Sequence, residues 1–202
     1  MPANLAKPKA VHAFPSTLLA LLAVLVLIAI TTAQSADPAR PIPDGFDREA
    51  SLNAVFAEMG KASNETQGNV ASEKMWAVFM LTPDATSAAI MNRGLRARER
   101  FDLEVAFGFF SQVIQSQPNY AEAWNQRAYI HFVRKRYDEA LADCTKTLEL
   151  EPRHVGCMAG IARIHLIRKD YARADTFIRR AIALHPWIAD RVMLKEIPLE
   201  RL

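Results

Sequence analysis

Two histidines, His131 and His165, stand 34 residues apart and invite comparison with a pair of metal ligands. Two imidazoles on one zinc ion must each bring a nitrogen to about 2.1 Å from the metal. On successive packed helices, the helix axes lie about 9 Å apart. That separation is too large for both rings to reach one ion. We therefore predict packed histidines, each with one ring nitrogen bonded locally, and no metal site.

The two cysteines, Cys144 and Cys157, could form a disulfide if the chain is exported to an oxidising compartment. They lie on either side of the segment Glu151–Arg153, about two turns from a bend in a helical hairpin. Their Cα atoms would then exceed the roughly 7 Å limit for a disulfide. Two buried thiols are favoured, and a disulfide stays open as the alternative.

The sequence has none of the residue patterns typical of common catalytic sites. It contains no glycine-rich phosphate loop, no His-Glu metal-binding helix motif and no nucleophile elbow. Its 202 residues are 50% hydrophobic, which suits one globular domain. The 25 Lys and Arg residues against 22 Asp and Glu residues give a net charge of +3, too small to favour nucleic-acid binding. We predict a non-enzymatic protein with no cofactor and no nucleic-acid partner.

The first 35 residues have the layout of a secretory signal peptide. Lys7 and Lys9 precede an apolar run, Leu18–Ile30, and small residues follow it. We predict residues 1–35 as a cleaved leader and a periplasmic location. The alternative is an uncleaved anchor in the inner membrane, and only this form would contact a membrane. The proline-rich residues 36–46 are predicted to form a tether.

A repeat of constant length organises the second half of the chain. Pro118, Pro152 and Pro186 are spaced by 34 residues and divide the sequence into the blocks 87–120, 121–154 and 155–188. Small residues recur in the same register, at Gly94, Ala106, Ala128, Ala140, Ala162 and Ala174. Small residues let two helices cross closely, and each proline ends the second helix of its block. Each block is therefore predicted to be a pair of antiparallel helices.

The middle block, from Ala121-Glu122-Ala123-Trp124 through Tyr137-Asp138-Glu139-Ala140-Leu141 to Pro152, resembles the tetratricopeptide repeat almost throughout. The third block matches through Tyr171, Ala174, Ala181 and Pro186, and the first matches least well. The resemblance implies an all-α fold, an α-solenoid of antiparallel helix pairs. A helix pair over residues 47–83 is expected to cover the apolar flank of the first block, and residues 189–202 to cap the other end.

The resemblance also implies a concave groove, lined by the first helix of each block, in which a segment of a partner lies. The exposed groove positions are then Met91, Leu95, Arg98, Glu122, Asn125, Tyr129, Phe132, Val133, Gly156, Ala159, Arg163, Leu166 and Ile167. This surface is apolar, as contact surfaces are. The alternative is that the capping segments or a self-contact cover it.

Six of these residues are the predicted ligand site: Arg98, Glu122, Asn125, Tyr129, Phe132 and Arg163. Tyr129 and Phe132 are the apolar anchors, and the two arginines would pair with acidic side chains of the partner. The lysines that grip a terminal carboxylate in some members of the family are absent here.

The predicted function is a non-enzymatic interaction scaffold that binds a protein or peptide segment with apolar anchors, in assembly or in chaperone-like work. Residues 153–186 hold 7 basic and 2 acidic residues, so an acidic partner at the third block is a further expectation. The alternative is a membrane-anchored tethering protein that carries the repeats.

Overall fold

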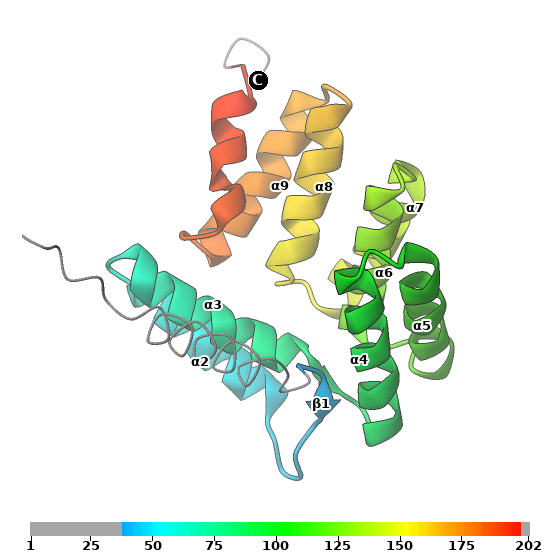
Figure 1. The fold of residues 1–202 in the computed structure, drawn as a ribbon. Coiled ribbons are helices and arrows are strands. Elements are labelled where there is room, and N and C mark those ends of the chain that lie inside the picture. Colours follow the sequence, from blue (N-terminus) through cyan, green and yellow to red (C-terminus); the bar gives the residue numbers. More distant parts are fainter. Residues whose placement is uncertain (1–37, 199–202) are drawn as a thin grey trace, which may run out of the picture. The chain divides into compact units, whose positions relative to one another are not determined.

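The computed structural model describes residues 38–198, and these form an all-α solenoid of antiparallel helix pairs (Figure 1), as predicted. The elements are β1 (Arg40–Pro41), α2 (Arg48–Lys61), α3 (Glu65–Phe79), β2 (Leu81–Thr82), α4 (Ala85–Glu99), α5 (Leu103–Ser116), α6 (Ala121–Val133), α7 (Tyr137–Leu150), α8 (Val155–Ile167), α9 (Tyr171–Leu184) and the 3₁₀ helix η1 (Ala189–Glu196). The predicted leader lies outside the described residues. Among residues 38–198, no helix is long and apolar enough to cross a bilayer.

The helix ends follow from local sequence. Asp47, Asn64 and Asp84 each accept a hydrogen bond from a backbone N–H three residues on, which satisfies a free donor at the start of α2, α3 and α4. The helices α5, α7 and α9 each end two residues before a proline of the 34-residue series. Proline disfavours helical geometry in the residue before it, so the series sets the length of every block.

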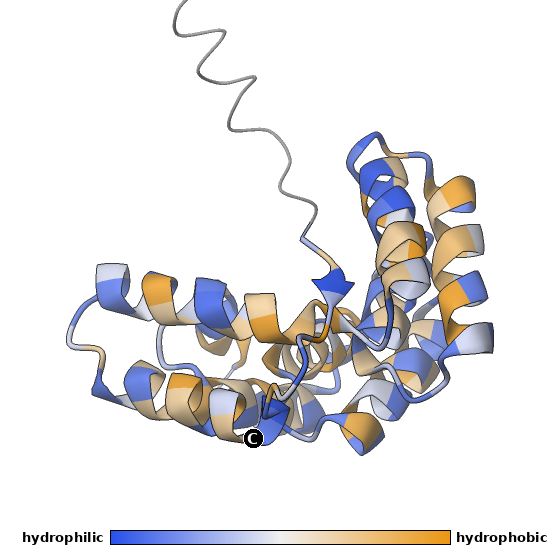
Figure 2. Ribbon diagram, turned by 90° about the horizontal axis from the view of Figure 1, so that it is seen from below, coloured by the Kyte–Doolittle hydropathy of each residue, from blue (hydrophilic) through white to orange (hydrophobic). Residues whose placement is uncertain are grey.

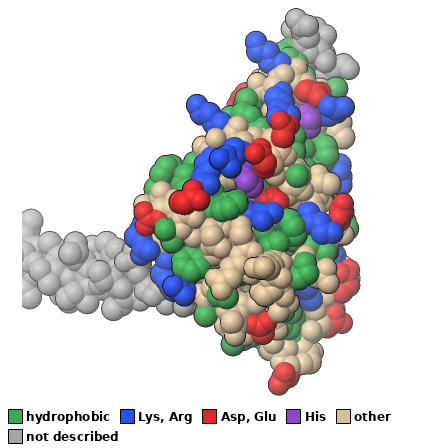
Figure 3. All heavy atoms as spheres, turned by 90° about the vertical axis from the view of Figure 1, so that its right-hand side faces the viewer, with side chains coloured by type: hydrophobic (Ala, Val, Ile, Leu, Met, Phe, Trp, Pro, Cys, Tyr) green, Lys and Arg blue, Asp and Glu red, His purple; other side chains and the backbone are tan. Residues whose placement is uncertain are grey.

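The turns between the two helices of each block also repeat. Phe101, Lys135 and Lys169 have φ angles of 65°, 59° and 60° and occupy the same register. Beside these turns, two ion pairs at equivalent positions link successive blocks: Arg134 pairs with Glu104 at 2.7 Å, and Arg168 pairs with Asp138 at 2.8 Å. Figure 3, which views the molecule from the side of α4–α7, shows basic and acidic side chains intermixed on this surface.

Polar and apolar residues alternate along each helix (Figure 2), so each helix buries one face. Close packing within a block depends on small residues. A Cβ atom on Gly94 would lie 2.5 Å from the ring of Phe110, and Ala140 and Ala174 are almost wholly buried. The apolar faces of the helix pairs form the core of the solenoid.

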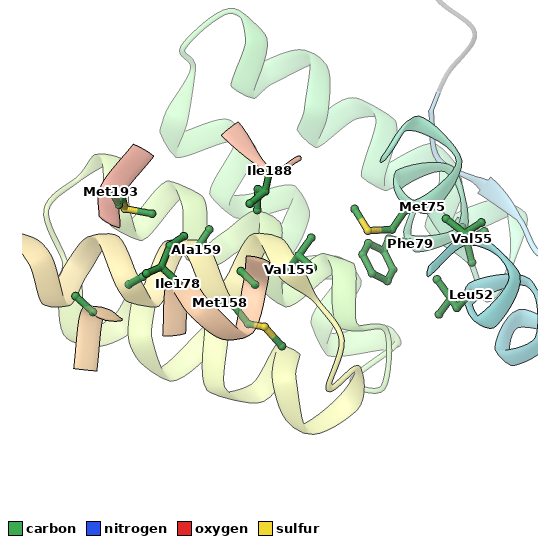
Figure 4. Packing of buried hydrophobic residues seen from close by; sticks show 14 of the residues in the cluster. Leu52, Val55, Met75, Phe79, Val155, Met158, Ala159, Ile178, Ile188 and Met193 are labelled. Atoms are coloured by element: carbon green, nitrogen blue, oxygen red, sulfur yellow. The ribbon is translucent and has the colours of Figure 1, made fainter. Parts of the chain in front are cut away.

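The N-terminal hairpin α2–α3 does not cover the first block, and this part of the prediction is wrong. Its buried residues Leu52, Met75 and Phe79 share one hydrophobic cluster with Val155 and Met158 of α8. The cluster continues into α9 and the C-terminal segment. Figure 4 shows Met75 and Phe79 pointing from α3 toward Val155, and Figure 1 shows the hairpin below α8 and α9.

The first block needs no such cover because its outer flank is polar. Ile130 and Ile164 are buried where α6 and α8 follow the preceding block. At the equivalent position of α4 the chain has Arg96, which is exposed. Terminal repeats of a solenoid require a polar outer face. The first block is therefore the end of the stack, and the hairpin is free to pack elsewhere.

The described part of the predicted tether over 36–46 is held against β2 and α4. Arg40 and Pro41 pair in parallel with Leu81 and Thr82, and the backbone of Ala39 exchanges two hydrogen bonds with the side chain of Asn92, at 3.0 and 2.7 Å. Proline-rich composition excludes long strands, but it does not prevent a two-residue ladder at an edge.

The C-terminal segment closes the other end of the stack. Beyond α9, the 3₁₀ helix η1 and the residues around it bury Ile188, Met193 and Ile197 in the same cluster as Ile178 of α9. The α2–α3 hairpin and the C-terminal segment thus both pack around the third block. This arrangement places cap residues beside the first helices of the second and third blocks.

Candidate functional site

A cavity of about 620 Å³ lies where α3, α6, α8 and the segment before η1 meet. Four of the six predicted ligand residues line it: Asn125, Tyr129, Phe132 and Arg163. Arg98 and Glu122 are not among its lining residues. The cavity occupies part of the predicted groove, and its remaining walls come from α3, α7 and residues 185–190.

Several positions predicted to be exposed in the groove are buried. Met91 and Leu95 are 0% and 3% exposed and pack in one cluster with Ala39 and Phe110. Ala159 is also buried, in the cluster that contains the α2–α3 hairpin. The capping segments thus cover the groove at Ala159, as in the alternative considered from the sequence, whereas Met91 and Leu95 are buried by neighbouring repeat residues and by Ala39. The cavity is a part of the groove that stays open.

Glu122 is a structural residue rather than an exposed groove residue, since it is 1% exposed. Its carboxylate lies 2.9 Å from Nε2 of His154 and accepts hydrogen bonds from the side chains of Asn125 and Gln126 at 2.9 and 2.5 Å. Burial alone would raise the pKa of Glu122, but the bond and charge of His154, with the two amides, lower it. Phe79 stacks on His154 with ring centroids 4.6 Å apart.

The two predicted register-setting arginines are engaged within the chain. Arg98 donates to the side chain of Gln126, and its guanidinium lies 5.4 Å from the ring centroid of Tyr129. Arg163 forms an ion pair with Asp190 of η1. The sequence did not reveal these partners because both lie far along the chain from the arginines they bind.

Tyr129 and Phe132, the two predicted apolar anchors, both line the cavity. Tyr129 is 46% exposed and forms part of the cavity wall. Phe132, three residues on, is half-buried and packs against Tyr137 with centroids 5.8 Å apart. Three-residue spacing puts both rings on one side of α6.

Two tryptophans complete the cavity, and neither belongs to the groove positions predicted from the sequence. Trp76 of α3 lies against Gly156 of α8, where a Cβ atom would be 2.8 Å from the indole. Trp187 lies against Gly68 of α3, where a Cβ atom would be 2.3 Å away. A glycine inside a helix can indicate that another group approaches the backbone closely. Gly68 and Gly156 are two such glycines in this sequence.

Cys144 and Cys157 are free, buried thiols. Cys144 lines the cavity, and Sγ of Cys157 donates to Oδ1 of Asn125 at 3.2 Å. Burial raises the pKa of Cys157 well above its ordinary value, and the neighbouring Cys144 raises it further. A buried thiol of this kind is a poor nucleophile.

His131 and His165 contact different carboxylates. Nε2 of His131 is 3.7 Å from Asp143, and Nδ1 of His165 is 3.3 Å from Asp170. Within residues 38–198, no three His, Cys, Asp or Glu side chains are grouped so that they could hold a metal ion.

The basic residues of the third block are largely paired at the surface. Arg168, Arg173 and Arg179 form ion pairs with Asp138, Asp170 and Asp175 respectively. Arg180 lies over the ring of Phe177 at 5.2 Å. Exposed pairs of this kind are weak, so their guanidinium groups remain accessible to water and to other anions.

Comparisons with known proteins agree with this architecture. Residues 121–154, the middle block, match the family model of the tetratricopeptide repeat. The chain is 27% identical over 113 residues to a TPR repeat-containing protein of Rhizobium etli, covering 56% of this chain and 55% of that protein. It is 24% identical over 139 residues to the BBSome complex member BBS4 homolog of Drosophila melanogaster, covering 69% of this chain and 28% of that protein. The chain thus spans about half or less of the curated relatives it matches.

Among solved structures, the chain is similar to the first TPR of Spaghetti (RPAP3), described as bound to the HSP90 peptide SRMEEVD. The TM-score is 0.53 at 15% sequence identity, over 55% of this chain and 89% of that one. The similarity supports the fold of stacked helix pairs, which the repeat in the sequence predicted.

Proposed function

We propose that this protein is a non-enzymatic interaction scaffold that holds a segment of a partner protein in the 620 Å³ cavity. The observation that carries the proposal is the cavity itself, which is lined by Tyr129 and Phe132 of α6, by Trp76 of α3 and by Trp187, which follows α9. Aromatic side chains are enriched at the centres of protein interfaces because they bury a large apolar area. The cavity is large enough for one bulky side chain of a partner with its neighbouring backbone.

The comparisons support an interaction role at a coarser level. A structural neighbour with stacked helix pairs is described as bound to a peptide, and the middle block matches a repeat found in scaffold proteins. The buried thiols and the dispersed carboxylates give no reason to propose catalysis in the described part of the chain. Micromolar affinity, about −8 kcal/mol, would suit transient assembly or chaperone-like binding.

The double variant Tyr129→Ala with Phe132→Ala tests the cavity as the binding site. A photo-reactive residue at position 129 should crosslink the partner in extracts of the cells that produce the protein, and mass spectrometry then identifies it. The double variant should lose capture of that identified partner, because it removes two aromatic side chains that line the cavity. Its helical content should stay unchanged.

The matched control uses Val105, a residue of α5 that is 51% exposed and outside the cavity. A photo-reactive residue at position 105 should not yield the same crosslink, and Val105→Ala should retain capture. Retained capture by the double variant would contradict the proposed site.

A second partner surface is proposed on the third block. Its basic side chains, including Lys169 and Arg180, would attract an acidic protein surface by long-range electrostatics. Because exposed charges are screened within about 8 Å at physiological salt, this binding should weaken steeply as the salt concentration rises. Binding through the aromatic cavity should depend much less on salt, so a salt series separates the two contributions.

We also propose that residues 1–35 direct the chain to the periplasm, with the inner-membrane-anchored form as the alternative. This proposal rests on Lys7, Lys9 and the apolar run Leu18–Ile30. N-terminal sequencing of the protein isolated from its native cells tests it. A first residue near position 34 or 36 supports cleavage, and an intact start at Met1 supports the anchor.

A further inference from the structure

Cys144 occupies a position of the repeat that larger residues fill in the neighbouring blocks. The 34-residue register aligns Cys144 with Phe110 of the first block and with Ile178 of the third. Phe110 and Ile178 are fully buried, whereas Cys144 is one of the residues that line the cavity. Protein cores are close-packed, and a thiol is much smaller than a benzyl or a sec-butyl group. The second block therefore lacks volume at a place where its neighbours have it.

The residue across the helix pair from Cys144 shows where this volume is missing. In the first block the ring of Phe110 covers Gly94 of α4, where a Cβ atom would lie 2.5 Å from the ring. Ala128 of α6 holds the position of Gly94 in the second block, and it lines the cavity together with Cys144. The space that the equivalent side chain would fill in the second block is therefore part of the cavity.

The third block closes the same space with its own side chains. Ile178, which Figure 4 shows within the packed core, and Ala162 are buried in one hydrophobic cluster, and neither lines the cavity. Gly160 of α8 adds to the opening in the second block, because a Cβ atom there would be in ordinary contact with Sγ of Cys144, at 3.7 Å. Its equivalent in the second block is the larger Gln126.

We call the buried part of the cavity the floor, and it is lined by Ala128, Ala140, Cys144 and Gly160. None of these residues is charged, and a thiol is only a weak hydrogen-bond donor. The charged lining residues Glu65, Arg163 and Asp190 have more exposed side chains, and each is already paired with another residue. A charged or strongly polar group would therefore lose its water at the floor without gaining a partner, which is costly. The floor favours an uncharged, apolar group.

The pairing across each block also indicates the size of that group. An aromatic ring at position 110 requires a glycine at position 94, whereas isoleucine at position 178 accompanies alanine at position 162. The second block has an alanine, Ala128, at this register. Its methyl group takes up room that an aromatic ring needs in the first block. An aliphatic group of the size of the Ile178 side chain fits this arrangement best.

We propose that the floor of the cavity binds one branched aliphatic side chain of the partner segment, a leucine or an isoleucine, in the place that Ile178 fills in the third block. Cys144 then determines specificity, because its small size keeps the floor open. The inference rests on the proposed function and deepens it by naming the class of side chain that the cavity takes. The backbone on either side of that residue lies along the wall formed by Tyr129 and Phe132.

Two small probes of nearly equal shape test the chemistry of the floor: N-acetyl-leucinamide and N-acetyl-asparaginamide. In protein labelled with ¹³C at the alanine methyl groups, Ala128 and Ala140 report on the floor. Ala106 and Ala174 are matched controls, because they hold the register of Ala140 in the first and third blocks and do not line the cavity.

The leucine probe should shift the two floor signals and leave the two control signals unchanged. It should bind at least about tenfold more tightly than the asparagine probe, which is the effect of burying one aliphatic side chain. Equal binding of the two probes would overturn the inference. Tighter binding of N-acetyl-phenylalaninamide than of the leucine probe would overturn the choice of an aliphatic group.

The variant Cys144→Ile gives the second block the residue that the third block has at this position. It should fill the floor and so lose the shifts caused by the leucine probe, and its thermal midpoint should rise because the added carbon atoms occupy open space. Cys144→Ala is the matched control, since it keeps the floor open and should retain probe binding. Unchanged affinity of Cys144→Ile for the leucine probe would overturn the inference. The comparison of probes on the wild-type protein does not depend on how either variant folds.

The outcomes separate this inference from the proposed function. With the partner identified by crosslinking at position 129, Cys144→Ile should lose its capture although Tyr129 and Phe132 are intact. If Cys144→Ile retained capture while the Tyr129→Ala, Phe132→Ala variant lost it, the scaffold proposal would stand and the inference about the floor would be refuted. A leucine preference with no partner crosslinked at position 129 would count against a protein segment as the occupant and against the proposed function.

Discussion

At the scale of single residues, the buried pair of Glu122 and His154 is the most consequential feature. Both side chains are fully buried, and they join the first turn of α6 to the N-cap of α8 beneath Phe79 of the N-terminal hairpin. A buried charge is tolerated only where partners satisfy it, and here Asn125 and Gln126 supply the further hydrogen bonds. The pair thus holds α6 and the start of α8 together where the hairpin packs on them.

Glu122→Ala should strongly destabilise the protein because it leaves His154 buried without its partner. We expect the free energy of unfolding to fall by about 3–5 kcal/mol, measured by urea denaturation followed by circular dichroism. Glu99→Ala, at an exposed position of α4, is the control and should change the value by less than about 0.5 kcal/mol. Similar effects of the two substitutions would contradict the structural role of Glu122.

Acidification should also destabilise the fold. Burial lowers the pKa of both His185 and His131 below 6.5, although Asp143 partly opposes this at His131. The folded state then binds fewer protons than the unfolded state, so the contribution is complete above pH 6.5 and is lost as the pH falls through the folded pKa values. Glu122, with a pKa below 4.5, adds a loss at lower pH.

The urea midpoint should therefore fall between pH 7 and pH 5, and His185→Phe should reduce that fall. A midpoint that stays constant or rises on acidification would show that the histidines titrate as they do in the unfolded chain.

At the scale of elements, the decisive contacts are those between cap helices and repeat helices. α3 is held on α8 by Trp76 against Gly156, while Arg153 binds α2 through Asn53 and Glu49 at 2.6 and 2.8 Å. Each contact joins residues that lie far apart in the sequence. Because α3 packs here, it forms a wall of the cavity instead of covering the first block.

Gly156→Ala should loosen the docking of α3, since the new methyl group would overlap the Trp76 indole. We expect a loss of about 1 kcal/mol or more in thermal denaturation, together with a shift of the Trp76 indole signal. The matched control is Gly108→Ala in α5, where a Cβ atom meets nothing within 4 Å. That substitution should stabilise the protein by about 0.5–1 kcal/mol. If both variants were stabilised alike, α3 would not be packed tightly on α8.

At the scale of the whole molecule, the two caps and the third block share one continuous hydrophobic core. The largest hydrophobic cluster draws its members from α2, α3, α8, α9 and the C-terminal segment. A solenoid normally depends on nearest-neighbour contacts alone. Here contacts between distant segments add to those between successive blocks, so the stability of the third block depends on the N-terminal hairpin.

Removal of residues 1–83 should therefore destabilise the third block as well as the first, which loses its contacts with Ala39. The deletion uncovers Val155 and Met158 of α8, and we expect increased binding of the dye ANS and faster amide exchange in α8 and α9 than in the full chain. Removal of residues 1–36 alone is the control, since residues 37–202 form a compact unit. Faster exchange confined to α4 and α5 would place the hairpin on the first block.

The sequence by itself determined the repeating part of this protein. Proline spacing, small residues in register and polar turns are local signals, and they predicted helix pairs that the structure contains. It also placed Asn125, Tyr129, Phe132 and Arg163 on one surface, because a helix repeats every 3.6 residues. The polar Arg96, at the register of Ile130 and Ile164, could have shown that the first block ends the stack.

Only the tertiary structure decided where the caps pack. Trp76 and Trp187 became cavity walls, Glu122 became buried, and Arg163 gained Asp190 as a partner. The caps lie outside the 34-residue repeat, so no periodic signal sets their position. Apolar helix faces can pack against any complementary surface, and the choice depends on shape and on glycine contacts that form only when the whole chain folds.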